Sequence, residues 1–404
     1  MNCNQKTALI QSASLIVGID IAKKVHVATL MNSKGQEIKK GLNIPNTRDG
    51  LLKLRALLEP YDPKSVIISM EPTGHYYKSL AYHFKKQGYM ITLINPYHTK
   101  LSKEIGNNSR SKDDTKDSRL IARLTYEAKF SKAILQESMY AEVRKLSLLR
   151  NQTVQARTRC IIQLKTLLDE YLPEYDSFFK DITCGSSFAL LETYGIKGLK
   201  KHDKIAEKIA LLVKKSRGQV SQIRAESFIE RLANSIGVSE GLDAAELGLQ
   251  LQLKQTQADK ENEKVLRAAI EKLLPKLPET QYLESIPGVG VIALGEILGQ
   301  TGSFDNYQNY KQIEKLAGLT PAHIMSGNFK GTTRINKRGG ANLRGALHKV
   351  AISLISNNKS FEPLYKARIE KKPKMVALIA LQVKLIRIMF SMVKNKQMYN
   401  ERLI

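Results

Sequence analysis

The sequence has few cysteines, few prolines and glycines, and few acidic residues for its length. Three cysteines in 404 residues, Cys3, Cys160 and Cys184, are too few and too widely spaced for a disulfide framework or a zinc site. The 25 glycines and 12 prolines are too few for a protein built from repeats or linkers. No apolar run reaches the roughly 18 residues of a membrane span, and the N-terminus lacks the pattern of a signal peptide. We therefore expect a cytoplasmic protein without a membrane partner.

The most unusual property of the sequence is its excess of positive charge. Lysine and arginine total 64 against 38 aspartates and glutamates, which gives a formal net charge of +26. Residues 321–404 hold 17 of these cations and only three acids, and apolar stretches that predict folded helices separate them. The hydrophobic content of 42% is ordinary and excludes general disorder. A soluble protein this basic usually binds a polyanion, most often nucleic acid.

The first hundred residues predict an α/β domain. Short apolar runs predict strands, and apolar residues at three- and four-residue spacing predict helices. The expected strands are residues 15–20, 25–30, 36–43, 65–70 and 90–95, and the expected helices are residues 46–58 and 75–87. Three consecutive strands followed by alternating helices and strands resemble the ribonuclease-H-like (RuvC-like) fold.

The rest of the chain predicts helices. Apolar residues recur at helical spacing over 138–172 and 242–274, and a proline ends each segment. These two helices could pair as an antiparallel coiled coil, with residues 175–240 as an insertion between them. From about residue 280 the pattern predicts short helices joined by glycine and proline turns, and hence an all-α region. The expected domains are residues 1–128, 129–278 and 279–404.

Four carboxylates lie where the expected elements of the α/β domain begin or end. Asp20 ends the first strand, and Glu71 follows the fourth. Asp114 and Asp117 stand at the expected start of a helix, where their spacing places them on one face. Clustered carboxylates repel one another unless cations neutralise them, and the hard cations Mg²⁺ and Mn²⁺ prefer oxygen ligands. Two such ions about 4 Å apart can stabilise the attacking and leaving oxygens of a phosphodiester.

Each acid taken singly has a simpler interpretation. An aspartate after a buried strand is often a turn or helix-capping residue. Asp113, Asp114 and Asp117 also suit the positive end of a helix dipole. Only their combination, on the expected elements of this fold in a basic protein, favours a metal site.

Two glycine-containing motifs lie nearer the C-terminus. The sequence Ile-Pro-Gly-Val-Gly at 286–290 resembles a helix-hairpin-helix element, in which Gly288 and Gly290 would let the turn approach a phosphate. A plain turn between two helices has the same composition. Ser326 opens a Ser-Gly-Asn motif, and a serine becomes a nucleophile only where a base or a metal activates it. The candidates for phosphate contact in the basic run that follows are Lys330, Arg334, Lys337, Arg338 and Arg344.

Together these motifs resemble the DEDD-type transposases of the insertion sequence 110 family, whose relatives include the Piv-type DNA invertases. The similarity extends from about residue 15 to residue 395, with the motifs in family order. The motifs are V-G-I-D, M-E-P-T-G, K-x-D-x-x-D, I-P-G-V-G, A-G-L-x-P, S-G-N and N-K-R-G-G-A-N-L-R.

The resemblance implies roles for five residues. Asp20, Glu71, Asp114 and Asp117 would form the metal-binding tetrad, and Ser326 would be the nucleophile that joins covalently to DNA. It also implies a structured guide RNA, DNA as donor and target, and a dimer or tetramer whose active site could combine acids and serine from different subunits. The sequence departs from the family pattern at Asp113, which replaces a small residue. Either Asp113 or Asp114 could be the third ligand, and the three-residue step to Asp117 favours Asp114.

Two other functions fit part of the sequence. A RuvC-like nuclease, such as a junction resolvase, would use the same four acids with water as the nucleophile and would not need Ser326. A non-catalytic nucleic-acid-binding protein would gain nothing from clustered carboxylates. The leading hypothesis is a recombinase that cuts and rejoins the DNA of an insertion sequence.

Overall fold

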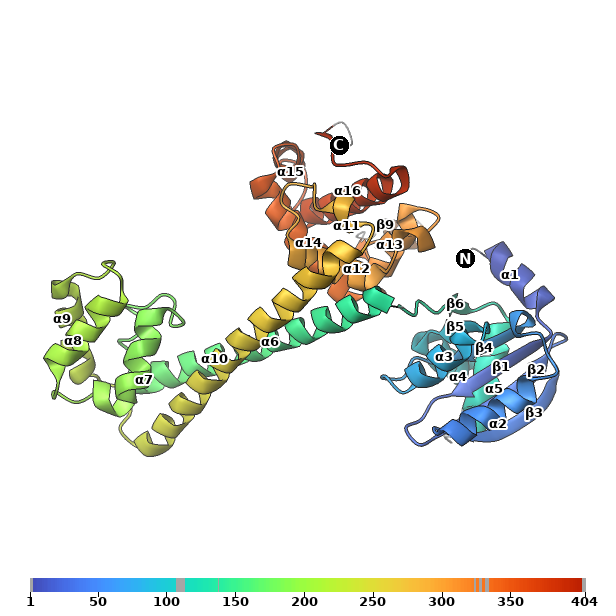
Figure 1. The fold of residues 1–404 in the computed structure, drawn as a ribbon, viewed down its shortest axis with the longest axis horizontal. Helices are drawn as coiled ribbons and strands as arrows, with labels where there is room; N and C mark the ends of the chain where they lie inside the picture. The colour runs from blue at the N-terminus through green and yellow to red at the C-terminus, as the bar shows by residue number, and fades with distance from the viewer. Residues whose placement is uncertain are drawn as a thin grey trace. The chain divides into compact units, whose positions relative to one another are not determined.

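The fold comes from a computed structural model of the chain (Figure 1). The structure describes residues 3–106, 113–136, 138–322, 325–326, 329–330 and 334–401. The chain divides into two compact units, Met1–Leu135 and Gln136–Ile404. The first unit thus continues beyond the expected boundary at residue 128, because a last strand joins its sheet at 130–132. The further division at residue 278 stays a prediction.

The first unit is built on one mixed six-stranded sheet with the strand order β3-β2-β1-β4-β5-β6. Its strands are β1 (Leu15–Asp20), β2 (Val25–Asn32), β3 (Glu37–Pro45), β4 (Val66–Met70), β5 (Met90–Ile94) and β6 (Phe130–Lys132). Strands β1, β4 and β5 are parallel, whereas β2, β3 and β6 pair antiparallel with their neighbours. The expected α/β domain and its first five strands are confirmed.

Helices cover both faces of this sheet. They are α1 (Cys3–Ser12), α2 (Arg48–Leu58), α3 (Tyr77–Lys86), α4 (Pro96–Gly106) and α5 (Asp114–Tyr126), and a 3₁₀ turn, η1 (Pro63–Ser65), precedes β4. Alternate residues of β1 point to opposite faces, so Val17 packs in one core with Leu54 and Phe84. Ile16 packs in the other core with Ile121 of α5. The central strand is therefore buried on both sides, as its continuous apolar run indicates.

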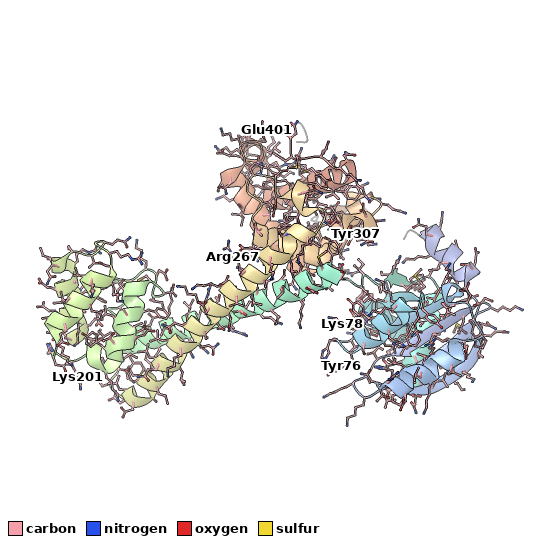
Figure 2. All side chains as sticks on the ribbon, viewed as in Figure 1. Tyr76, Lys78, Lys201, Arg267, Tyr307 and Glu401 are labelled. Atoms are coloured by element: carbon pink, nitrogen blue, oxygen red, sulfur yellow. The ribbon has the colours of Figure 1, made fainter. Side chains whose placement is uncertain are left out.

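Two long helices form the arm of the second unit. They are α6 (Ser138–Tyr171), with 34 residues, and α10 (Leu242–Leu273), with 32, and they pack along each other (Figure 1). This confirms the two long helices predicted for 138–172 and 242–274. Between them, α7 (Gly185–Leu199), α8 (Ile205–Lys215) and α9 (Gln222–Ala233) share a core around Tyr175 and Phe228 with the adjoining ends of both arm helices. Lys201 lies in the turn between α7 and α8 (Figure 2).

The C-terminal part of the second unit is a helical bundle. It contains η2 (Leu274–Lys276), α11 (Thr280–Leu283), α12 (Val291–Thr301), η3 (Phe304–Asn306), α13 (Tyr310–Ala317), α14 (Ala341–Asn357), α15 (Phe361–Ile369) and α16 (Lys374–Asn395). Helix α12 crosses α6 at very close range. A Cβ added to Gly299 would lie 2.8 Å from the Arg144 Cα, and one added to Gly295 would lie 2.8 Å from Ile270. At Gly299 the bundle therefore packs backbone against backbone on α6, and at Gly295 it packs against the Ile270 side chain of α10.

The expectation of an all-α C-terminal region is wrong between α13 and α14. Four two-residue strands lie there: β7 (Pro321–Ala322), β8 (Met325–Ser326), β9 (Phe329–Lys330) and β10 (Arg334–Ile335). Strand β10 pairs with β7 and β8 pairs with β9, both antiparallel. The segment is rich in glycine, threonine and asparagine and lacks helical apolar spacing, so local turns and short ladders satisfy its backbone instead.

Helix α16 is the one described helix that is largely apolar over the length of a membrane span, although Lys384 and Arg387 interrupt its apolar residues. By length and composition it could cross a membrane, with a mean hydropathy of 1.9 over its most apolar window. Half of that window is buried inside the protein, where Leu385 and Met389 pack in the C-terminal core. A buried core helix can be as long and as apolar as a membrane-spanning helix, so the packing of α16 in the C-terminal core explains its apolar composition.

Candidate functional site

The first two acids leave the sheet side by side. Strands β1 and β4 are parallel neighbours whose register pairs Ile19 with Met70. Asp20 is the residue after Ile19, and Glu71 is the residue after Met70. Both carboxylates are thus carried by the carboxyl ends of adjacent strands, and both side chains are half-buried.

The other two acids come from the start of α5. The Asp113 side chain caps this helix by accepting a hydrogen bond from the Thr115 backbone N–H at 2.9 Å. Asp114 and Asp117 then lie in the first helical turn, three residues apart. Because one carboxylate oxygen of Asp113 is engaged as a cap, Asp114 is the better candidate for the third ligand.

A glycine on β1 fixes α5 against the sheet. A Cβ added to Gly18 would lie 2.3 Å from the Ala122 backbone nitrogen and 2.5 Å from the Ser118 carbonyl oxygen. The side chains of Thr29 and Ser118 share a buried hydrogen bond of 2.8 Å nearby. The helix can approach β1 this closely only because residue 18 has no side chain, and that approach brings the first turn of α5 toward Asp20.

The environment of Asp20 connects it with the other three acids. The pKa of Asp20 rises from its ordinary 3.8 to about 6. Burial is the largest cause, followed by the negative charges of Asp117, Asp114 and Glu71, while the charge of Lys103 opposes the shift. Each of the other three carboxylates thus adds to the negative potential at Asp20, so they lie near it.

Two side chains from α4 contact this cluster, and the sequence analysis missed both. The Lys103 Nζ lies 2.7 Å from the Asp117 Oδ2, and the Thr99 hydroxyl donates a hydrogen bond of 2.9 Å to the Glu71 Oε2. Helix α4 follows β5, which lies next to β4 in the sheet. Their place in the chain after β5 is the signal that could have identified Lys103 and Thr99, because residues that follow β5 emerge at the same edge of the sheet as Glu71.

A divalent cation could bind this cluster only if the acids have suitable geometry and suitable donor atoms. In the parts of the chain that the structure describes, no group of three or more histidine, cysteine or carboxylate side chains could hold a metal ion as it stands. The donors nevertheless have the right chemistry, since carboxylate oxygens are the ligands that Mg²⁺ and Mn²⁺ prefer. Burial raises the pKa of Asp20 most, and the charges of Asp117, Asp114 and Glu71 raise it further, so negative charge gathers at this site. The acids therefore fit a cation by charge and donor type.

Ser326 and Lys330 lie in the second unit, in the short ladder between β8 and β9. Ser326 stands opposite Phe329, and Lys330 stands opposite Met325. The side chains of these residues lie outside the described part of the structure, as do Gly327 and Asn328 of the Ser-Gly-Asn motif.

The remaining basic candidates follow this ladder. Arg334 on β10, Lys337 and Arg338 are exposed. Lys337 adopts a left-handed backbone with φ of 56°, and its N–H donates to the Gly318 carbonyl at 3.0 Å. Arg344 is half-buried and donates to the Ala317 carbonyl at 2.9 Å, so part of its guanidinium holds the end of α13.

The Pro-Gly-Val-Gly turn lies between α11, a single helical turn, and α12. Gly288 has φ of +95°, a conformation that favours glycine, and an added Cβ would press on Leu354. Gly290 is the N-cap residue of α12 and has an ordinary extended backbone. Nothing lies within 4 Å of a Cβ added at Gly290. Backbone geometry therefore explains the first glycine but not the second.

Comparisons with known proteins match both units. A family model described as a transposase, of the DEDD type named after IS110, matches residues 17–173. A model of the IS116/IS110/IS902 transposase family matches residues 280–366. The chain is 22% identical to the pilin gene-inverting protein of Moraxella lacunata, over 96% of this chain and 98% of that protein. It is also 29% identical to the transposase for insertion sequence element IS1111A of Coxiella burnetii, over 30% of this chain and 34% of the relative.

Proposed function

The chain belongs to the IS110 family of transposases, and we propose that it cuts and rejoins DNA in the cytoplasm with a carboxylate tetrad and a serine nucleophile. The observation that carries the proposal is the arrangement of the acids in the first unit. Asp20 and Glu71 leave adjacent parallel strands in register, and the charges of Asp114 and Asp117 act on Asp20. This arrangement supports a ribonuclease-H-like assignment for the sheet domain.

Asp20, Glu71, Asp114 and Asp117 would hold Mg²⁺ or Mn²⁺. A divalent ion there would supply positive charge that polarises a phosphodiester and stabilises the charge that develops on its oxygens. The protein's own groups prepare this site. Lys103 partly neutralises Asp117, and Thr99 orients Glu71 through its hydrogen bond to the carboxylate.

Ser326 would be the group that attacks DNA. The hydroxyl loses its proton as its oxygen forms a new bond to the phosphorus, the bond from phosphorus to a deoxyribose oxygen breaks, and that oxygen takes up a proton and leaves as a hydroxyl. The phosphoserine ester keeps the energy of the broken bond, so the hydroxyl of another DNA end can reverse the step and join a new strand. Hydrolysis by water would lose that energy, which is the physical reason for a side-chain nucleophile in a recombinase.

The basic residues near Ser326 would stabilise the negative charge of the phosphate during this exchange. Exposed Lys337 and Arg338 are the first candidates, together with Arg334 and Lys330. The charge excess of residues 321–404 supports contact with nucleic acid. The proposal also includes a structured guide RNA and a dimer or tetramer, and both of these rest on the family resemblance.

The test is to trap the reaction with denaturant and look for DNA covalently attached to the protein. We expect an adduct from the unaltered protein, and from Ser326→Ala we expect DNA binding without an adduct or recombinant product. Ser177→Ala is a matched control, because Ser177 is exposed in the same unit and donates to the Glu174 carbonyl three residues away. Normal recombination by Ser326→Ala would refute the serine mechanism and favour a nuclease that uses water.

A further inference from the structure

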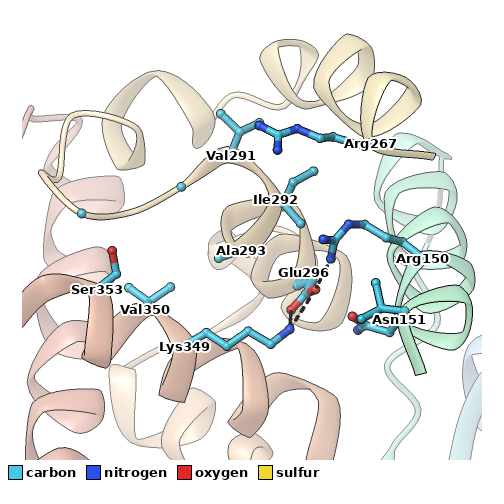
Figure 3. Close-up of a pocket in the computed structure, with 13 residues that line it drawn as sticks. Arg150, Asn151, Arg267, Val291, Ile292, Ala293, Glu296, Lys349, Val350 and Ser353 are labelled. Atoms are coloured by element: carbon cyan, nitrogen blue, oxygen red, sulfur yellow. Dashed lines mark hydrogen bonds and ion pairs between the residues drawn. The ribbon is translucent and has the colours of Figure 1, made fainter. Parts of the chain in front are cut away.

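A cavity of about 490 Å³ lies in the second unit where the arm meets the C-terminal bundle (Figure 3). Three cationic side chains from three different helices line it: Arg150 of α6, Arg267 of α10 and Lys349 of α14. Among the described residues that line it, Glu296 of α12 is the one acid. In the lining itself three cations face one carboxylate, and Glu263 and Glu271 pair with Arg150 and Arg267 outside it.

Glu296 holds two of these cations in place. Its side chain is only 3% exposed, and the Lys349 Nζ lies 2.9 Å from its Oε2 and 3.2 Å from its Oε1 (Figure 3). The Arg150 guanidinium lies 3.5 Å from the Glu296 Oε1 and donates more closely, at 2.6 Å, to Glu263. These contacts position the cations from opposite sides of the cavity. The Arg150 Nε–H is buried without an acceptor among the described residues, so the network leaves a donor unused.

Of the three cations, Arg267 makes the weakest contacts within the protein. It projects from α10 (Figure 2), and its side chain is 60% exposed. Its guanidinium lies 2.8 Å from the carboxylate of the exposed Glu271, four residues along the helix. Exposed pairs of this kind contribute little to stability. Arg267 can therefore turn to an anion in the cavity at little cost to the fold.

The glycine turn forms another wall of the cavity. Gly288, Gly290 and the first residues of α12 all line it. Because a Cβ at Gly290 would meet no atom within 4 Å, the fold does not need glycine there, and any side chain at this position would enter the open space. Gly290 also provides no side-chain cap for α12. The wall therefore presents bare backbone beside three cations.

We propose that this cavity binds a phosphate of a nucleic-acid backbone. Phosphate oxygens would accept hydrogen bonds from Arg150, Arg267 and Lys349, and the bare turn at Gly290 would let the sugar-phosphate chain approach the protein backbone. The identification of the bound polyanion as nucleic acid rests on the proposed action of the protein on DNA. The cavity adds an anchoring point at the base of the arm, carried by residues outside the tetrad and the serine motif.

The first experiment replaces Gly290 by aspartate. Aspartate is a favourable N-cap residue, so Gly290→Asp should preserve or raise the thermal stability. Its carboxylate would occupy the cavity and repel a phosphate, so we expect about tenfold weaker binding of a fluorescein-labelled DNA duplex. Gly248→Asp is the matched control, because Gly248 on α10 also has nothing within 4 Å of an added Cβ and does not line the cavity.

The second experiment measures how binding depends on salt. Arg267→Gln should reduce the slope of log affinity against log salt by the amount expected for about one phosphate contact. Lys264→Gln on the same helix should leave the slope unchanged. A labelled RNA hairpin is titrated in parallel. If the substitutions weaken the binding of DNA or of RNA, that nucleic acid is the one that occupies the cavity. Unchanged binding of both polymers by folded Gly290→Asp and Arg267→Gln would overturn the proposal. All titrations contain EDTA, so the result is independent of cleavage and of the role of Ser326.

Discussion

Replacing Asp20 by asparagine should stabilise the first unit at neutral pH in the absence of divalent metal. The pKa of Asp20 lies at about 6 in the folded protein against an ordinary 3.8, because burial and three neighbouring carboxylates disfavour its charge. Below about pH 4 the residue is protonated in both the folded and the unfolded chain, and the folded state has no penalty. As the pH rises toward 6 the unfolded chain ionises first, so the protein progressively loses stability.

The size of the effect follows from the shift. Each tenfold change in an ionisation equilibrium corresponds to about 1.4 kcal/mol, so the rise from 3.8 to about 6 sets an upper limit of about 3 kcal/mol. Asp20 is half-buried, and solvent screening reduces this value. We expect Asp20→Asn to gain about 1–2 kcal/mol at pH 7.5 in EDTA and to lose this advantage near pH 4.

Hydrogen exchange of peptides from β1 and β4 is the appropriate assay, because it reports the stability of this sheet without requiring two-state unfolding of the whole chain. Adding Mg²⁺ should protect the unaltered protein more than Asp20→Asn and so narrow the difference. Glu59→Gln, which removes the same charge at the end of α2, is the control and should show neither effect. A less stable Asp20→Asn at pH 7.5 in EDTA would refute the electrostatic argument.

Other predictions follow from contacts of the same unit and of the basic region. Gly18→Ala should cost about 1–3 kcal/mol by forcing α5 off β1, and it should lower metal-dependent activity, as unfolding and recombination assays can show. Asp113→Ala should lose about 1 kcal/mol with its helix cap and still recombine DNA, whereas Asp114→Ala should not; equal activities would reverse the choice of ligand. Charge reversal of Lys337 and Arg338 should weaken binding to many DNA sequences alike and flatten its salt dependence, measured by titration.

Strong local patterns predicted most of the sheet and the arm. Strands β1, β4 and β5 are continuous apolar runs because both of their faces are buried, and α6 and α10 have apolar spacing sustained over many turns. The three-residue β6 was not predicted, since it is too short for a pattern and forms because β5 offers an open edge. Strands β7 to β10 were missed for a similar reason.

The acids could be placed on their elements from sequence, but their partners could not. Asp20 and Glu71 were expected at strand ends, and both lie there. Lys103 and Thr99 contact the acids only because β5 pairs beside β4, and strand order is a long-range property. The cavity at the base of the arm was hidden for the same reason, since Arg150 and Lys349 meet Glu296 across long sequence separations.

The backbone contact of α12 with α6 at Gly299 makes the arm of the second unit a spacer of fixed length. Because the α12 backbone packs this tightly on α6, the base of the arm is held against the bundle, and the length of the arm is set by α6 itself. At 1.5 Å per residue, α6 spans about 50 Å, which corresponds to about 15 base pairs of B-form DNA at 3.4 Å each. Removing seven residues from each arm helix would shorten this span by about 10 Å while keeping the packing faces nearly aligned. Any two segments of nucleic acid held at the ends of the arm would then be brought closer by about three base pairs.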